Sequence, residues 1–364
     1  MNILYLTNHL NVGGITSYLL ALAGAVKQRG HKVYLASSQG ELTPKFIAAG
    51  IEFIPIAIMT KSELSPKIWI SLFKLLALVK EKDIQIIHAN TRVTQVLACL
   101  LSRFSGRPFV STCHGFFKPR LSRRVFGCWG KKVIAISEQV KEHLRGDFHV
   151  LEPDIRVIHN GIDILKFARA ANRAPQTEKA KLGLKDSPVL GIIARLSDVK
   201  GHIYLIQAMA LVLQAIPRAQ LLIIGEGKMK NELVNLAREL KIGESVIFIP
   251  TLEDTPLALA AMDIFVMPSL AEGLGLGVME AMAAGVCVVA SGVGGLRSLI
   301  TNNVNGILVE PKNTQALAEA IVDLLKDEDK RRALAAAGQN CAKENFSSQI
   351  CADLTCEVYS ECLK

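Results

Sequence analysis

Residues 268–285, PSLAEGLGLGVMEAMAAG, place two carboxylates, Glu272 and Glu280, around a glycine-rich turn. Strong helix formers follow at 278–284, so the turn predicts the start of a helix. Three glycines let the backbone of this turn approach a ligand closely: Gly273, Gly275 and Gly277. Because a helix N-terminus attracts anions, one interpretation is a bound phosphate group. The other is a buried helix entered through a flexible loop, with Glu280 in a structural salt bridge.

Residues 194–201, ARLSDVKG, supply the cations that a phosphate site needs. Arg195 and Lys200 flank a short loop between a predicted strand and a predicted helix, at the carboxyl end of the strand where open parallel sheets bind ligands. With phosphate on these cations, Glu272 and Glu280 would bind neutral hydroxyl groups. An ordinary basic loop is the alternative.

Short β-branched runs alternate with helical patterns along the chain. The first five predicted strands cover residues 2–7, 32–37, 84–88, 108–112 and 132–136. The alternation stops in the polar segment 168–180 and resumes from about Pro188 to Glu310. A chain of 364 residues, half of them apolar, is long enough for two domains with separate cores. We therefore predict an α/β protein with two Rossmann-like doubly wound domains that face a cleft.

We expect four segments within this architecture. They are an N-terminal domain at 1–165, a linker at 166–187, a C-terminal domain at 188–345 and a C-terminal helix at 346–364.

A dinucleotide-dependent dehydrogenase also uses doubly wound sheets, but the sequence disfavours it. The first strand leads into Asn11-Val12-Gly13-Gly14 without a third glycine. The second predicted strand ends in Ala36-Ser37-Ser38, where an acidic group would hold the ribose of NAD. Gly13 and Gly14 either form a tight strand-to-helix turn for its own geometry or present backbone N–H groups to a donor phosphate.

Four motifs in order resemble those of the family 4 glycosyltransferases, a large retaining group with the GT-B fold. Residues 272–280 resemble its two-glutamate signature, E-x7-E, and residues 194–201 resemble its G-R-L-x-x-x-K-G, with Ala194 in place of glycine. IIGEG at 223–227 resembles I-V-G-x-G, and NGID at 160–163 resembles N-G-V-D. The resemblance extends from the first strand to about residue 345. It is weaker at 293–300, where Arg297 and Ser298 replace a usual Pro-Glu pair.

The resemblance implies transfer, with retention, of a hexose-type sugar from a UDP- or GDP-sugar. It implies that Glu272 holds hydroxyls of the transferred sugar, Glu280 those of the ribose, and Arg195 with Lys200 the diphosphate. The C-terminal helix would cross back onto the N-terminal domain. The donor-binding residues would be Gly13, Gly14, Arg195, Lys200, Glu272, Gly273, Gly275, Leu276, Gly277 and Glu280.

His114 ends a predicted strand and precedes Gly115, so its imidazole can face the cleft. It matches a family histidine that contacts the donor sugar, and we group it with Glu272, Arg195 and Lys200 as the catalytic residues. A structural histidine at a strand end is the alternative, and His88 could have the same structural role.

No metal site is evident in the sequence. The acidic run Asp327-Glu328-Asp329 is surrounded by basic residues and is typical of a solvated turn. The eight cysteines have no CxxC spacing, so we expect reduced thiols. We predict an enzyme without metal or other cofactor, whose nucleotide sugar is a substrate.

The charge of the chain is unevenly distributed. Residues 1–165 hold 21 Lys and Arg against 11 Asp and Glu, and ten of these basic residues lie between Arg103 and Arg145 with two acidic ones. Aromatic residues are interleaved with this charge at 116–129. The pattern favours docking on an anionic membrane over a solvated basic helix face, and no nucleic-acid-binding motif accompanies it.

We expect a cytoplasmic monomer, peripheral on the inner face of the membrane. No apolar run is long enough to span a bilayer, and residues 2–7 have no basic leader, so they predict a strand instead of a signal peptide. The leading hypothesis is a glycosyltransferase acting on a lipid-linked, lipopolysaccharide or other envelope glycan. The alternatives are a GT-B epimerase, a phosphorylase and a non-catalytic nucleotide-sugar-binding protein.

Overall fold

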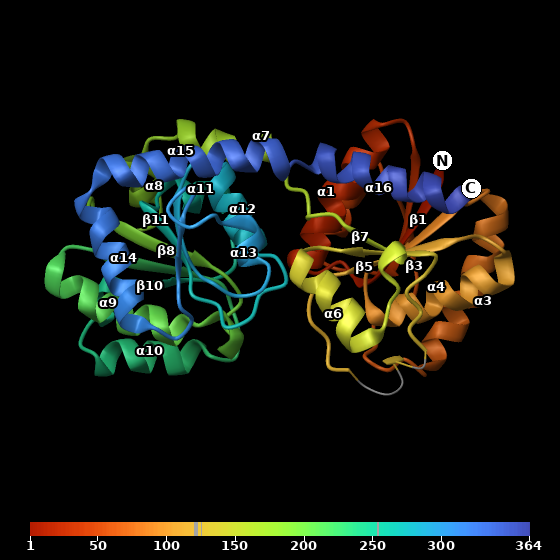
Figure 1. Ribbon diagram of the computed structural model, residues 1–364, viewed down its shortest axis with the longest axis horizontal. Helices are drawn as coiled ribbons and strands as arrows, with labels where there is room; N and C mark the ends of the chain where they lie inside the picture. The colour runs from red at the N-terminus through yellow and green to blue at the C-terminus, as the bar shows by residue number, and fades with distance from the viewer. Residues whose placement is uncertain (120–122, 125, 253–254) are drawn as a thin grey trace. The chain divides into compact units, whose positions relative to one another are not determined.

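The computed structural model describes residues 1–119, 123–124, 126–252 and 255–364. These residues form two compact units, each built on a parallel sheet with helices on its faces (Figure 1). Unit 1 combines Met1–Ile162 with Ser348–Lys364, and unit 2 is Asp163–Ser347. The predicted α/β class with two doubly wound domains is confirmed.

Unit 1 contains a seven-stranded sheet in the order β3-β2-β1-β4-β5-β6-β7. Its strands are β1 (Asn2–His9), β2 (Lys32–Ser38), β3 (Glu52–Pro55), β4 (Ile86–Ala89), β5 (Phe109–Cys113), β6 (Lys132–Ala135) and β7 (Ile155–Val157). Its described helices of more than one turn are α1 (Gly14–Gln28), α2 (Thr43–Ala48), α3 (Pro66–Glu81), α4 (Arg92–Ser105), α6 (Glu138–Phe148) and α16 (Ser348–Leu363).

Helices cover both faces of the central strands, so these strands are apolar on both sides. Residues 3–7 of β1 are all buried, and β1 pairs in parallel with β2 and β4. The order of the strands reverses between β1 and β4, which makes their carboxyl ends the topological switch point of unit 1.

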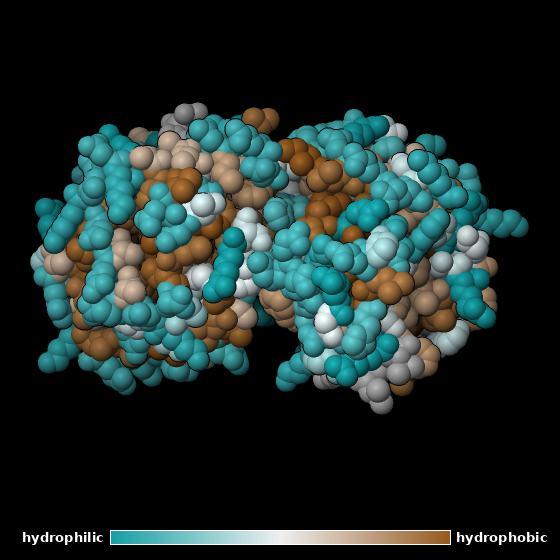
Figure 2. All heavy atoms as spheres, in the orientation of Figure 1, coloured by the Kyte–Doolittle hydropathy of each residue, from teal (hydrophilic) through white to brown (hydrophobic). Residues whose placement is uncertain are grey.

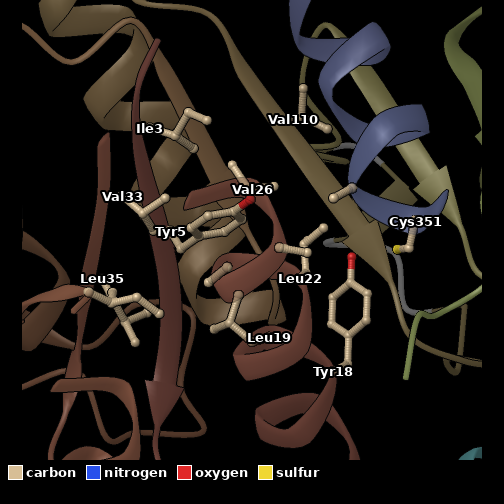
Figure 3. Packing of buried hydrophobic residues seen from close by; sticks show 14 of the residues in the cluster. Ile3, Tyr5, Tyr18, Leu19, Leu22, Val26, Val33, Leu35, Val110 and Cys351 are labelled. Carbon is tan, nitrogen blue, oxygen red and sulfur yellow. The ribbon is translucent and has the colours of Figure 1, made fainter. Parts of the chain in front are cut away.

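The C-terminal helix α16 belongs to unit 1, as the resemblance implies. Cys351, Tyr359 and Cys362 of α16 join a buried cluster with residues of β1 and α1. Figure 3 shows Cys351 of α16 beside Tyr18 and Leu22 of α1. The closely spaced cysteines near the C-terminus are thus helix positions, and all eight cysteines of the chain are free thiols.

Unit 2 contains a six-stranded sheet in the order β10-β9-β8-β11-β12-β13. Its strands are β8 (Val189–Ile193), β9 (Gln220–Ile224), β10 (Val246–Ile249), β11 (Ile264–Met267), β12 (Cys287–Ser291) and β13 (Ile307–Val309). Its described α-helices are α7 (Ile164–Ala168), α8 (Pro175–Lys181), α9 (His202–Ala215), α10 (Lys230–Glu239), α11 (Thr255–Ala260), α12 (Leu276–Ala283), α13 (Leu296–Leu299), α14 (Thr314–Lys326) and α15 (Glu328–Asn345). Here the strand order reverses between β8 and β11.

Residues 166–187 differ from the linker that the sequence predicts. They belong to unit 2 and contain the helix α8. Lys179 of α8 is buried, and its Nζ donates hydrogen bonds to Asp263 Oδ2 at 3.1 Å and to the Ser187 carbonyl at 2.9 Å. Asp263 Oδ2 also accepts from the backbone N–H of Val189 at 2.8 Å. This partly buried ion pair fixes the segment to the first strand of unit 2. The polar composition of residues 168–180 gives no sign of this packing.

Hydrophilic side chains cover most of the visible surface, with scattered apolar groups between them (Figure 2). Within the part of the chain that the structure describes, no helix has the length and apolar character to cross a membrane.

Candidate functional site

The loops that follow β8 and β11 carry the predicted site residues Arg195, Lys200 and Glu272. Arg195 follows β8, and Glu272 follows β11, so the two loops flank the switch point of the sheet. Crevices at switch points are where doubly wound sheets bind ligands. The order of the strands thus brings together motifs that are about 75 residues apart in the chain.

The IIGEG turn after β9 supports the Arg195 loop through its two glycines. A Cβ atom on Gly225 would lie 2.1 Å from the Ala194 carbonyl oxygen, and one on Gly227 would lie 2.2 Å from that of Leu196. The N–H of Leu196 donates to the Glu226 carbonyl at 2.9 Å. Glycine is therefore required at this turn by close packing of two backbones.

Gly201 joins the loop after β8 to the loop after β11. It caps α9 with a left-handed φ of 70°, and a Cβ atom there would lie 1.9 Å from the Pro268 carbonyl oxygen. The N–H of Leu270 also donates to the Val199 carbonyl at 2.8 Å. This close approach places Lys200 beside Glu272.

Lys200 and Glu272 form an ion pair. Lys200 Nζ lies 2.5 Å from Glu272 Oε2, and the Ser269 hydroxyl donates to the same oxygen at 3.3 Å. The pair compensates the negative charge of Glu272 where a second anion would otherwise be repelled. Arg195 is exposed and makes no ion pair with a residue that the structure describes. It presents a guanidinium that fits a diphosphate.

The structure shows a packing role for two glycines of the glycine-rich turn, and close approach of a ligand to this turn stays a prediction. Gly275 caps α12 with a φ of 107°, and a Cβ atom on it would lie 2.6 Å from the Leu296 side chain. Gly277 lies inside the first turn of α12, where a Cβ atom would be 3.3 Å from the Ile193 carbonyl oxygen. Both glycines let α12 pack closely on its neighbours. Leu276 begins the helix, and no acidic residue occupies its first turn.

Glu280 lies in the second turn of α12 and is half-buried. Its burial raises the pKa of the carboxyl to about 7, and the ammonium of Lys166 in α7 opposes this rise. The carboxyl makes no hydrogen bond or ion pair with the described residues, which excludes the structural salt bridge within that set. It is therefore free to accept hydrogen bonds from a ligand.

In unit 1, Gly13 and Gly14 lie between β1 and α1 and are exposed. Gly13 is extended, with a φ of 166°, and a Cβ atom on it would have no heavy atom within 4 Å. Neither backbone strain nor local packing therefore requires glycine at position 13. The first turn of α1 holds no acidic residue, so its N–H groups suit an anion.

His114 follows β5 and is partly buried. Its Nε2 lies 3.4 Å from Asn90 Oδ1, and its ring meets that of Tyr18 edge to face at 4.9 Å between centroids. Burial lowers the pKa of His114 to about 3. The imidazole is neutral near pH 7 and acts there as a hydrogen-bonding group, not as a cation.

His88 has the structural role that the sequence allows for it. Its Nδ1 lies 2.6 Å from the Tyr359 hydroxyl of α16, and its Nε2 lies 2.7 Å from Thr112 Oγ1. The Tyr359 hydroxyl donates to that of Tyr5 at 3.0 Å. This fully buried network links the C-terminal helix to three strands of unit 1.

The sequence alone does not identify several residues at these two sites. Ser269 bonds the Glu272 carboxyl, Lys166 acts on Glu280, and Asn90 and Tyr18 flank His114. Ser269 lies within the quoted motif and could have been found there. The others become neighbours only through the fold.

Asp327 of the acidic run at 327–329 caps both α14 and α15, and Glu328 and Asp329 lie in the first turn of α15. Asp327 Oδ1 accepts from the N–H of Lys330 at 2.9 Å, and Glu328 pairs with Arg332. Across residues 1–119, 123–124, 126–252 and 255–364, no three His, Cys, Asp or Glu side chains gather as a metal site would require.

The basic segment 103–145 is only partly exposed. Arg120, Leu121, Ser122 and Val125 lie outside the described residues. The Arg123 guanidinium stacks on Phe117 at 4.4 Å, and Trp129 packs against Phe148. Phe126 is 70% exposed and Phe116 44%. Two of the aromatic side chains that the sequence places on a membrane surface are therefore engaged within the unit.

Two Rossmann-like units, with cations and carboxylates at the carboxyl ends of the second sheet, define a protein of the GT-B class. Solved structures of glycosyltransferases have the same fold. A glycosyltransferase from Rickettsia africae superposes with a TM-score of 0.87 at 24% identity, covering 100% of this chain and 98% of that one. Anabaena HepE, determined in complex with UDP-glucose, gives 0.86 at 25% identity, covering 99% and 100%.

Two family models match the two halves of the chain. The model described as Glycosyltransferase Family 4 matches residues 12–165, and that described as Glycosyl transferases group 1 matches residues 175–340. A UDP-Gal:alpha-D-GlcNAc-diphosphoundecaprenol alpha-1,3-galactosyltransferase of Escherichia coli is 30% identical over 273 residues, which are 71% of this chain and 70% of the relative. A GDP-mannose-dependent alpha-(1-6)-phosphatidylinositol monomannoside mannosyltransferase of Mycolicibacterium smegmatis is 29% identical over 359 residues, covering 92% and 91%. The chain belongs to glycosyltransferase family 4.

Proposed function

We propose that this protein transfers a hexose-type sugar, with retention of anomeric configuration, from a UDP- or GDP-sugar to a hydroxyl of a lipid-linked or other envelope glycan. The observation that carries the proposal is the ion pair of Lys200 with Glu272 at one switch point, beside Arg195, which has no ion-pair partner among the described residues. The two relatives support it, because their names describe a UDP-sugar enzyme and a GDP-sugar enzyme with lipid-bearing acceptors.

Unit 2 would bind the donor. Arg195, Lys200 and the N-terminus of α12 would stabilise the charge that develops on the departing diphosphate. Glu272 would accept hydrogen bonds from hydroxyls of the transferred sugar, held in position by Lys200 and Ser269. Glu280 would accept from the ribose hydroxyls, and Gly13 with Gly14 would offer N–H groups to the diphosphate.

Retention would follow a same-face displacement, because no side chain stands out as a covalent nucleophile. The departing phosphate would take the proton of the acceptor hydroxyl as the new glycosidic bond forms and the sugar–phosphate bond breaks. His114, neutral near pH 7, would contribute a hydrogen bond to the sugar without adding charge. We also propose that the enzyme needs no metal, is a monomer and works in the cytoplasm at the membrane surface.

The test is thermal-shift and calorimetric binding of UDP-, GDP-, ADP- and TDP-sugars, in EDTA and in Mg²⁺. The donor site is supported if one nucleotide sugar stabilises the protein in EDTA as well as in Mg²⁺. Its affinity should fall at least tenfold in Glu280→Ala and stay unchanged in Glu239→Ala. Glu239 ends α10 and is an exposed carboxylate that serves as the matched control. If none of the nucleotide sugars binds, the proposal of a working transferase loses its basis. If binding is lost in EDTA, the proposal that no metal is needed is wrong.

Product analysis separates the alternatives. An epimerase would convert the donor without an acceptor, and a phosphorylase would need inorganic phosphate. A non-catalytic binding protein would be stabilised by donor yet give no turnover with a lipid-diphosphate-linked glycan. NMR of the first glycosidic product reports whether the anomeric configuration is retained or inverted.

A further inference from the structure

Helix α3 exposes an apolar face although its other face is in the core. Ile68, Leu72 and Leu75 are buried in the core of unit 1. The exposed fractions of Trp69, Ile70 and Phe73 are 49%, 67% and 68%. Phe73 follows Trp69 by four residues and Ile70 by three, so Phe73 neighbours both of them on one side of the helix. Monomeric proteins rarely leave such clustered large apolar side chains in water without a partner.

This surface continues toward the carboxyl edge of the sheet. Leu64, just before α3, is 90% exposed. The neighbouring Glu63 accepts from Arg92 at 3.0 Å, and Arg92 also donates to the Phe126 carbonyl at 2.7 Å. Asn8 at the end of β1 donates to the Thr60 carbonyl at 3.0 Å. The loop before α3 therefore lies at the edge where Gly13, Gly14 and His114 follow their strands.

Basic residues border this surface. Residues 59–80 contain four lysines and one acidic residue, Glu63, which pairs with Arg92. Lys67 and Lys74 lie three residues before and four residues after Ile70, so they neighbour it on the helix surface. Lys67 Nζ donates to the Met59 carbonyl at 3.2 Å, and Lys74 Nζ donates to the Pro55 carbonyl at 2.7 Å. Figure 2 shows apolar atoms at the surface over α3 and α4, bordered by hydrophilic ones.

We propose that this α3 face, defined as Leu64, Trp69, Ile70 and Phe73, docks on the surface of an anionic lipid bilayer. An apolar stripe bordered by lysines complements the acyl boundary and the phosphate headgroups together. The inference rests on the proposed function, because docking here would bring the acceptor edge of unit 1 to a lipid-linked glycan. It assigns the contact to α3, whereas the sequence placed it in the segment 103–145.

A second copy of the chain fits the α3 face less well. A two-fold symmetric pair would oppose the same patch on both copies, so the four lysines would face each other across an apolar contact. Anionic headgroups instead compensate these lysines. The occupant is therefore a bilayer, and self-association becomes an outcome that the experiment detects.

The experiment is co-sedimentation of the full chain with vesicles of phosphatidylcholine alone and of phosphatidylcholine with phosphatidylglycerol. The triple variant Trp69→Ser, Ile70→Ser, Phe73→Ser should lower partitioning into anionic vesicles at least about tenfold. Lys67→Gln with Lys74→Gln should lower it about fivefold per lysine and leave the neutral vesicles unaffected. The control Leu165→Ser with Val304→Ser changes side chains of comparable exposure, 73% and 59%, in unit 2 and should leave partitioning unchanged.

Fluorescence gives a second readout that does not depend on a disruptive variant. Trp129→Phe leaves Trp69 as the only tryptophan of the chain, and its emission should shift to the blue on anionic vesicles. The proposal is overturned if the protein does not bind anionic vesicles or if the triple variant binds them as wild type does. It is also overturned if the α3 face instead forms a concentration-dependent dimer. Donor binding is measured in parallel on every variant, so loss of the donor site is distinguished from loss of docking.

Discussion

Glu272 and Glu280 illustrate how two carboxylates in one motif acquire different properties. Glu272 is paired with Lys200 and bonded by Ser269, so its negative charge is compensated. Glu280 lies half-buried without such a partner among the described residues, and its pKa rises to about 7. The first carboxylate is held in place by two partners, whereas the second changes its charge near neutrality.

The raised pKa of Glu280 predicts a pH-dependent stability. The folded state favours the protonated carboxyl, so the contribution of this group is fully favourable below the unfolded pKa of about 4.5 and is lost as pH rises through about 7. Glu280→Gln removes the charge and should be more stable than wild type at pH 8, by at most about 3 kcal/mol, with little difference at pH 4.5. Urea unfolding of the ligand-free protein at both pH values measures this. A variant less stable than wild type at pH 8 would contradict the burial argument.

The loop that connects β8 to α9 depends on one glycine. Gly201 and Gly183 share a φ of 70°, but a Cβ atom on Gly201 would meet the Pro268 carbonyl at 1.9 Å, whereas one on Gly183 would meet nothing within 4 Å. Alanine substitutions at these two positions therefore separate the free-energy cost of a left-handed backbone from that of a steric clash.

We predict that Gly183→Ala costs about 1 kcal/mol of unfolding free energy, the penalty of a left-handed alanine. Gly201→Ala should cost several kcal/mol and weaken donor binding, because the collision displaces Lys200 from Glu272. Urea unfolding and calorimetric donor binding on both variants test this. Equal losses in the two variants would show that the contact at Pro268 relaxes freely.

Sequence predicted the elements that have strong local patterns. The apolar runs of β1, β2 and β5 and the helix after the glycine-rich turn were recognisable. The strands β3 and β7 have only four and three residues and carry charged or polar side chains, so their pattern is too short to detect. Likewise α8 is polar in composition, and its packing on the sheet becomes evident only from tertiary contacts such as the Lys179–Asp263 pair.

The same reasoning found Glu272, Glu280, Arg195 and Lys200 from their motifs, but not their mutual contacts. The ion pair of Lys200 with Glu272 joins two loops that are 72 residues apart and depends on the strand order. The apolar face of α3 was missed because its periodicity alone does not tell which of two apolar faces is buried.

At the scale of the whole molecule, α16 makes unit 1 discontinuous in sequence. Tyr359→Phe would remove the hydroxyl that His88 and Tyr5 contact, and would leave buried polar atoms without a partner. We predict a loss of about 1–3 kcal/mol, confined to unit 1. Hydrogen exchange should accelerate in peptides from β1 and β4 and remain unchanged in unit 2.

Tyr204→Phe in α9 is the matched control, since no hydrogen bond of its hydroxyl joins it to the described residues. It should leave exchange in both units as in wild type. Faster exchange throughout unit 2 in Tyr359→Phe would contradict the assignment of α16 to unit 1.

The discontinuity of unit 1 also constrains the order in which a nascent chain can fold. Unit 2 is continuous over Asp163–Ser347 and is fully synthesised before α16 emerges from the ribosome. Until Cys351, Tyr359 and Cys362 arrive, the apolar residues of β1 and α1 that they cover lack their partner. The second half of the chain can therefore complete its folding first, and the first half keeps an apolar surface open to aggregation until α16 docks.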